Sequence, residues 1–129
     1  MVGAETAEYL AAQGKQVTLV EMMDSIATDM HRTSRLLLMF SFEDLGVKIL
    51  TKATVKAIND KGVSIDYIGK EKFLEADTVV LAIGSQQDRA LSEQLAKLKI
   101  EYYDVGDCAQ PRMLPDATLE GFNAALKVE

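Results

Sequence analysis

The chain has 129 residues, of which 48% are hydrophobic and 26% charged, a composition typical of one globular domain rather than of a disordered segment. A net charge of -6 argues against nucleic-acid binding, which needs a basic face. No apolar run is long enough for a membrane span, no secretory leader opens the sequence, and a single cysteine excludes an internal disulfide and a Cys-based metal site. We therefore expect a cytoplasmic protein with no nucleic-acid or membrane partner.

The first 21 residues contain the most specific pattern. Gly3 opens an Ala-rich helix over residues 3–13, Gly14 ends it, and an extended run over residues 16–21 finishes at Glu21. A helix opened by glycine, a turn, a strand and a terminal acid form the second half of a βαβ nucleotide-binding unit. In such a unit the start of the helix binds a pyrophosphate and the acid takes the ribose hydroxyls.

Each of these residues also has an ordinary explanation. Gly3 alone could be any helix start, and Glu21 alone a solvated strand end; together they favour the nucleotide site. Residues 22–24 bring no arginine for a 2′-phosphate, so the pattern favours NAD(H) over NADP(H). Glu5, in the first helical turn, is explained by the helix dipole alone. A complete unit would have a hydrophobic strand and two more glycines before Gly3, where only two residues stand.

The middle of the chain predicts a second helix and a small antiparallel sheet. The helix covers residues 29–45, has an apolar face of four residues and ends at Gly46, and a strand over residues 47–50 follows. The apolar face consists of Leu36, Leu37, Phe40 and Leu45. Extended segments at 54–59, 63–68 and 72–74 are separated by turns, the first of which contains Gly62, and form an antiparallel meander.

The last part alternates again between strand and helix. Residues 78–83 (TVVLAI), ended by Gly84, are typical of a strand buried on both faces, and residues 100–105 predict another strand, ended by Gly106 and Asp107. Helices are expected at 89–99 and 117–128. The fold class is therefore α/β, with a Rossmann-like parallel sheet flanked by helices and an antiparallel meander. Ligands of such sheets bind at the carboxyl ends of strands, although Asp107 could equally cap the following loop.

Three other features have simpler interpretations. Cys108 is interpreted as a partly buried structural thiol, because no second cysteine is present to form a redox pair. His31 has no evident nucleophile or metal partner and is interpreted as solvated. The methionines are interpreted as core filler; they are Met22, Met23, Met30 and Met39.

Three ordered motifs, VGAETAEYLAAQGKQVTLVE, EADTVVLAIGS and YYDVGDCAQPRMLPDATLEGFNAA, resemble the FAD/NAD(P)-dependent pyridine-nucleotide oxidoreductase superfamily. The chain is most similar to the C-terminal part of NADH:flavin oxidoreductases of the 2,4-dienoyl-CoA reductase and trimethylamine dehydrogenase type. The resemblance implies cofactor-binding roles for six residues. Gly3 would belong to the pyrophosphate loop, Glu21 to the adenosine ribose site, Glu5 to the nicotinamide surroundings, Gly84 to the crossover between domains, and Gly106 and Asp107 to the FAD site.

The resemblance further implies that residues 1–84 are an NAD(H)-binding domain lacking its first strand, and residues 85–129 a return segment to an FAD-binding domain. The parent would pass hydride from NADH to FAD; an alternative is a domain that holds an adenine nucleotide without redox chemistry. An interaction domain with neither role is a third possibility. Gln87 and Asp88 stand where the family often has Pro-Asn.

The lack of the first strand gives three further expectations. The chain would be a fragment, inactive alone and weak in pyrophosphate affinity. Because an unfilled sheet centre leaves backbone groups unpaired, residues 100–105 would fill the gap, or two chains would exchange strands as a homodimer.

Overall fold

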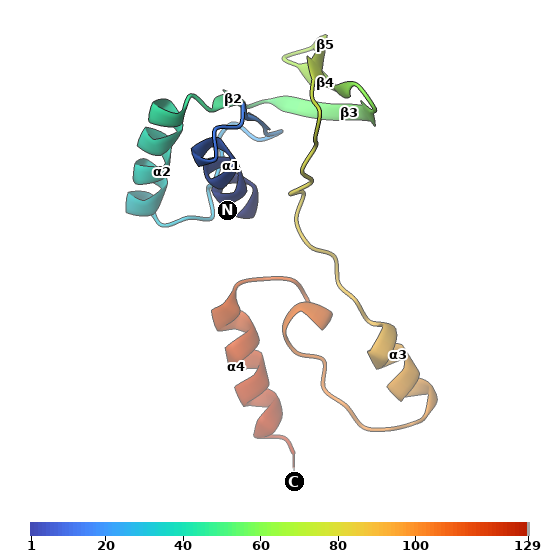
Figure 1. The fold of residues 1–129 in the computed structure, drawn as a ribbon. Coiled ribbons are helices and arrows are strands. Elements are labelled where there is room, and N and C mark those ends of the chain that lie inside the picture. The colour runs from blue at the N-terminus through green and yellow to red at the C-terminus, as the bar shows by residue number, and fades with distance from the viewer. Residues whose placement is uncertain (129) are drawn as a thin grey trace. The chain divides into compact units, whose positions relative to one another are not determined.

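The computed structural model describes residues 1–128, which form two compact units, the first spanning Met1–Ile83 and the second beginning at Gly84 (Figure 1). The first unit contains α1 (Val2–Ala12), β1 (Thr18–Val20), α2 (Arg32–Leu45), β2 (Lys48–Leu50), β3 (Ala53–Asn59), β4 (Gly62–Tyr67) and β5 (Lys70–Glu75). The second contains α3 (Ala90–Lys97), the short 3-10 helix η1 (Gly106–Cys108) and α4 (Leu114–Ala125).

The strands of the first unit make two sheets. β1 and β2 pair in parallel, with Leu19 opposite Ile49, and β3, β4 and β5 form an antiparallel meander. This confirms the α/β class with a parallel sheet, flanking helices and a meander. The strand β1 follows α1 after a turn in which Gly14 adopts a φ of +78°, and Leu19 of β1 packs against the core that contains Ala4 and Ala7 of α1.

The main core lies between α1, α2 and the parallel pair. The face of α1 that it buries is made of small residues, Ala4, Ala7 and Ala11. Methyl-sized side chains allow a close approach, and α2 inserts Leu38 and Phe42, which are only 4% and 1% exposed. These two residues are four apart and therefore share one helical face.

The apolar face predicted for α2 is wrong. Leu36, Leu37 and Phe40 are each more than half exposed, and Leu45 is 37% exposed. The reason is that α2 is apolar around most of its circumference from Leu36 to Leu45, so hydrophobic spacing alone does not select the side that meets α1. The end of the helix is as predicted, because Gly46 adopts a left-handed φ of +70°.

The meander has its own small core and a tight first turn. Ala53, Val63 and Ile65 are buried, the last completely. Asn59 pairs with Gly62 across a two-residue loop. Gly62 has a φ of +146°, and a Cβ placed on it would lie 2.0 Å from the carbonyl oxygen of Leu74 on β5. Glycine is therefore required there for close approach as well as for backbone conformation.

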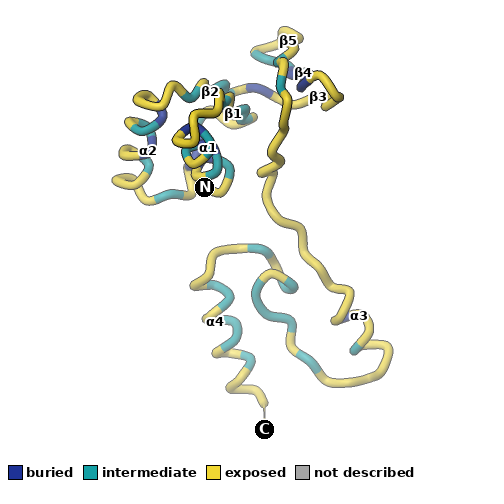
Figure 2. Tube along the Cα trace, in the orientation of Figure 1, coloured by how far each residue is buried: buried dark blue, intermediate teal, exposed yellow. Residues whose placement is uncertain are grey.

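Two predicted strands are absent from the described structure. Residues 78–83 and 100–105 form no strand; Val80, Leu81 and Ile83 are 54%, 66% and 90% exposed, and Figure 2 shows this stretch as exposed. A strand is stabilised by a hydrogen-bonded neighbour, and within residues 1–128 β1 pairs on one side only, with β2. The expectation that residues 100–105 fill the sheet is therefore wrong, while strand exchange between two chains stays a prediction.

The second unit consists of helices and an irregular connection. The helix α3 lies within the predicted range, whereas α4 begins three residues before Ala117, because Pro115 stands in its first turn, where proline is well tolerated. None of the helices described in residues 1–128 is long and apolar enough to cross a membrane.

Candidate functional site

The start of α1 presents backbone donors. The amides of Ala4 and Glu5 make the first helical bonds, to the carbonyl oxygen of Met1 at 2.9 and 3.2 Å, so the N–H groups of Val2 and Gly3 precede the helical ladder. The Met1 ammonium group donates to Asp29 Oδ1 at 2.7 Å, and this hydrogen bond lowers the pKa of Asp29 below its ordinary value. The loop that follows β1 therefore passes beside the start of α1.

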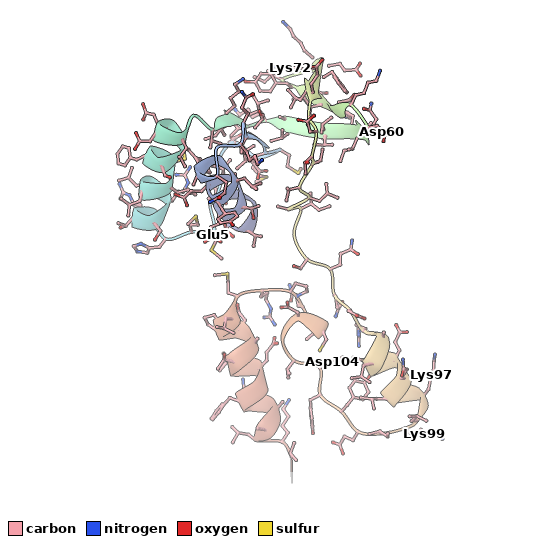
Figure 3. All side chains as sticks on the ribbon, viewed as in Figure 1. Glu5, Asp60, Lys72, Lys97, Lys99 and Asp104 are labelled. Atoms are coloured by element: carbon pink, nitrogen blue, oxygen red, sulfur yellow. The ribbon has the colours of Figure 1, made fainter. Side chains whose placement is uncertain are left out.

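Gly3 lies against the stretch that precedes Gly84. A Cβ added to Gly3 would lie 2.8 Å from the Cβ of Ala82, closer than side-chain carbons pack. The lack of a side chain therefore allows α1 to approach residues 78–83. Glu5, labelled in Figure 3, is exposed on α1 and, with Leu37 and Phe40 of α2, lines an open, shallow groove.

Glu21 directly follows β1, and its backbone is hydrogen-bonded to the end of β2 and to the start of β3. Its N–H donates to the carbonyl oxygen of Leu50 at 2.9 Å, and its own carbonyl oxygen accepts from Ala53 N–H at 3.0 Å. The half-buried carboxylate accepts from Met23 N–H at 2.9 Å. Glu21 opens the loop in which Asp29 contacts the Met1 ammonium group, next to the start of α1. A carboxylate with remaining acceptor capacity suits hydroxyl donors such as those of a ribose.

Cations reach the loop after β1 from elsewhere in the sequence, which the local pattern could not reveal. Lys52 Nζ lies 3.4 Å from Asp24 Oδ1. Arg35 of α2 donates to the carbonyl oxygen of Ile26 at 2.9 Å and to the hydroxyl of Ser25. Lys52 lies between β2 and β3 and Arg35 lies within α2, so only the pairing of β1 with β2 and the packing of α2 bring them here.

The methionine prediction is correct for two residues and wrong for the other two. Met30 and Met39 pack against the main core. Met22 and Met23 are 68% and 60% exposed because they lie in the loop after β1, outside the packed elements. His31 is exposed as expected, and its Nδ1 accepts from Thr33 N–H at 3.3 Å at the start of α2.

In the second unit, Gly106 and Asp107 form the turn η1. Gly106 has a φ of +64°, and its N–H donates to Glu120 Oε2 of α4 at 2.8 Å. Glu120 in turn pairs with the guanidinium group of Arg112. Asp107 is exposed, so its carboxylate suits a ligand hydroxyl. The N–H of Gly106 is already engaged by Glu120, which leaves the fit to a phosphate oxygen at that atom poor.

A second cluster in this unit centres on Asp104, labelled in Figure 3. Its carboxylate accepts from Arg89 at 3.1 Å and from the hydroxyl of Ser92, which is 5% exposed. Cys108 is partly buried, and its thiol donates to the carbonyl oxygen of Val105 at 3.0 Å. The thiol therefore has the structural position expected of it.

The six predicted site residues fall into two groups. Gly3, Glu5 and Glu21 belong to the first unit, and Gly84, Gly106 and Asp107 belong to the second. Gly84 is the first residue of the second unit and has a φ of +94°. Within residues 1–128 no three His, Cys, Asp or Glu side chains are placed to hold a metal ion.

This architecture, a parallel strand pair with α1 and α2 beside it and an acid at the end of β1, is that of dinucleotide-binding α/β proteins. The chain belongs to the pyridine nucleotide-disulphide oxidoreductase family, whose sequence model matches residues 1–121.

The relatives are named as oxidases and reductases. The chain is 38% identical over 130 residues to an NADH oxidase of Thermoanaerobacter brockii, covering 99% of the chain and 20% of that protein. It is 38% identical over 126 residues to a bilirubin reductase of Mediterraneibacter gnavus, covering 97% and 20%. A solved 2-naphthoyl-CoA reductase in complex with 2-naphthoyl-CoA superposes with a TM-score of 0.85 at 37% identity, covering 98% and 19%. The chain thus spans about a fifth of the length of the relatives it matches.

Proposed function

We propose that this chain is the NAD(H)-binding part of a flavin-dependent oxidoreductase in which NADH reduces FAD, of the NADH:flavin oxidoreductase, enoate or dienoyl-CoA reductase type. The proposal is supported by the position of Glu21 directly after β1, in a loop whose Asp29 contacts the Met1 ammonium group before α1, in a chain of the pyridine nucleotide-disulphide oxidoreductase family.

In the proposed complex the coenzyme supplies a hydride and the flavin accepts it. Glu21 accepts hydrogen bonds from the two hydroxyls of the adenosine ribose, and its contact with Met23 N–H holds the carboxylate in place. The N–H groups of Val2 and Gly3 face the diphosphate, favoured by the positive end of the helix dipole. Glu5 lies near the nicotinamide.

Residues of the second unit would serve the flavin. Asp107 accepts from a ribitol hydroxyl, because its carboxylate is exposed on η1. Gly106 allows the turn through its positive φ. Gly84, at the boundary of the two units, is where the chain would pass from the NAD(H) domain, residues 1–84, to the FAD-domain segment, residues 85–129.

The test is anaerobic reduction of the whole flavoprotein that carries this segment. NADH is expected to bleach the flavin absorbance, and Glu21→Ala is expected to raise the KM for NADH by roughly 10-fold or more, because a lost charge-assisted hydrogen bond costs about 1.5–3 kcal/mol. Glu71→Ala, which removes an exposed acid from β5, serves as the matched control and leaves the KM unchanged. Tight binding of NADH and ADP without bleaching would contradict the redox role and favour a nucleotide-holding domain.

A further inference from the structure

Lys52, which reaches the loop after β1, bears on which coenzyme the site selects. We propose that Asp24 and Lys52 act as a pair that disfavours a 2′-phosphate on the adenosine ribose, so that the site takes NADH in preference to NADPH. The inference rests on the proposed function of Glu21 and adds two specificity-determining residues to it.

The backbone fixes Lys52 at the same edge as Glu21. The N–H of Lys52 donates to the carbonyl oxygen of Met23 at 3.0 Å, and the next residue, Ala53, donates to the carbonyl oxygen of Glu21 at 3.0 Å. Ala53 is 2% exposed, and Lys52 is held at a φ of +53°, which few residues other than glycine adopt. The backbone of Lys52 is therefore held in place next to Glu21, the residue proposed to bind the ribose, by these two hydrogen bonds.

Its ammonium group is the cation at this edge with donors to spare. Lys52 Nζ pairs with Asp24 Oδ1 at 3.4 Å, and the two side chains are 59% and 83% exposed. A lysine carries three N–H donors, so this single contact leaves two for a ligand. Arg35, a further cation near the loop, donates to the hydroxyl of Ser25 and to the carbonyl oxygen of Ile26 and so holds the loop in place.

The charges at this edge explain the expected preference. A ribose diol brings two hydroxyl donors, which match the carboxylate of Glu21. A 2′-phosphate would instead meet the carboxylates of Glu21 and Asp24, and Lys52 is already partly neutralised by Asp24. Like charges close together disfavour binding, and Asp24 offsets the charge of Lys52, whose two free donors could otherwise bind the phosphate.

Replacing Asp24 should release Lys52. Asp24→Asn keeps the size of the side chain and removes its charge, and we expect the ratio of NADPH to NADH affinity to rise about fivefold, the scale of one exposed charge pair. Lys52→Met in the Asp24→Asn background should abolish the gain, because the phosphate then has no cation to meet. Glu21→Gln should weaken NADH binding and leave the effect of Asp24→Asn in place.

The matched control is Asp60→Asn. This variant changes the net charge by the same amount as Asp24→Asn. Asp60, labelled in Figure 3, lies in the β3–β4 turn, and the seven residues of β3, about 20 Å of strand, separate it from Lys52. NADH and NADPH are titrated in parallel, under anaerobic conditions, against the whole flavoprotein that carries this segment and against its variants. The readout is the ratio of the two dissociation constants, taken from the dependence of the flavin reduction rate on coenzyme concentration.

The outcomes separate the two proposals. A ratio that rises in Asp24→Asn, stays constant in Asp60→Asn and falls back in the double variant supports the pair. Equal changes of the ratio in Asp24→Asn and Asp60→Asn, or a gain that survives Lys52→Met, overturn the proposed role of Asp24 and Lys52. If NADH binding still depends on Glu21 in that case, the proposed function stands. Binding of neither coenzyme, or binding indifferent to Glu21, overturns both.

Discussion

Gly62 is the position where a single methyl group should damage the meander most. In Gly62→Ala the added Cβ would lie 2.0 Å from the carbonyl oxygen of Leu74 and 3.0 Å from the Cα of Glu75. Relief requires β5 to move away, which weakens the Gly62–Glu75 pair and the bond from Ala76 N–H to the carbonyl oxygen of Lys61 at 3.2 Å. Backbone strain at a φ of +146° costs about 1–3 kcal/mol and overpacking about 1–3 kcal/mol, so we expect a loss of about 2–6 kcal/mol in the free energy of unfolding.

Gly69→Ala is the matched control, because Gly69 lies in the other turn of the meander at a φ of +74° and has nothing within 4 Å of an added Cβ. That variant should lose only the left-handed backbone penalty of about 1–2 kcal/mol. Native-state amide hydrogen exchange of Ile65, the fully buried residue of β4, reports the stability of this sheet directly. Equal losses in the two variants would refute the close approach of the first turn to β5.

Three further predictions concern the helices and the second unit. Gly3→Ala should lower the free energy of unfolding by about 1 kcal/mol in denaturant titration, since overpacking outweighs the better helix propensity of alanine, and Ala82→Gly should restore it; stabilisation by Gly3→Ala alone would show that α1 does not press on residues 78–83. Phe42→Ala should cost about 3–5 kcal/mol in the same titration, because the side chain is 1% exposed, and a loss below about 1 kcal/mol would contradict the burial. The Glu101 carboxylate accepts from the Tyr103 hydroxyl at 3.0 Å and raises its pKa, so this contribution to stability is present below pH 10.0 and lost as the pH rises above it; NMR titration should show a lower Tyr103 pKa in Glu101→Ala, and an unchanged value would refute the contact.

Local signals in the sequence predicted most of the elements. Helices and turns are governed by residues close together in the chain, so the ranges of α1 and α2 and the positive φ of Gly46 and Gly62 follow from spacing and glycine placement. The buried face of α2 does not, because an apolar residue stands on nearly every side and only tertiary packing selects Leu38. Residues 78–83 have the composition of a central strand, but strand formation needs a partner that composition does not supply.

The site divides along the same line. Gly3 and Glu21 could be singled out because each stands at the end of a local element, and their roles stay predictions. Lys52 and Glu120 could not, because Lys52 reaches its loop through strand pairing and Glu120 reaches Gly106 of η1 from the helix α4, 14 residues further along the chain. Contacts of this kind carry no local sequence signal.

The exposed stretch at residues 78–83 has a consequence for the behaviour of the chain at high concentration. Its six residues, TVVLAI, hold no charge, proline or glycine and combine β-branched with aliphatic side chains, which is the composition of segments that stack into cross-β fibrils. Only Asp77 before it and Gly84 after it interrupt such stacking. Aggregation of the chain at high concentration is therefore expected to start from these six residues.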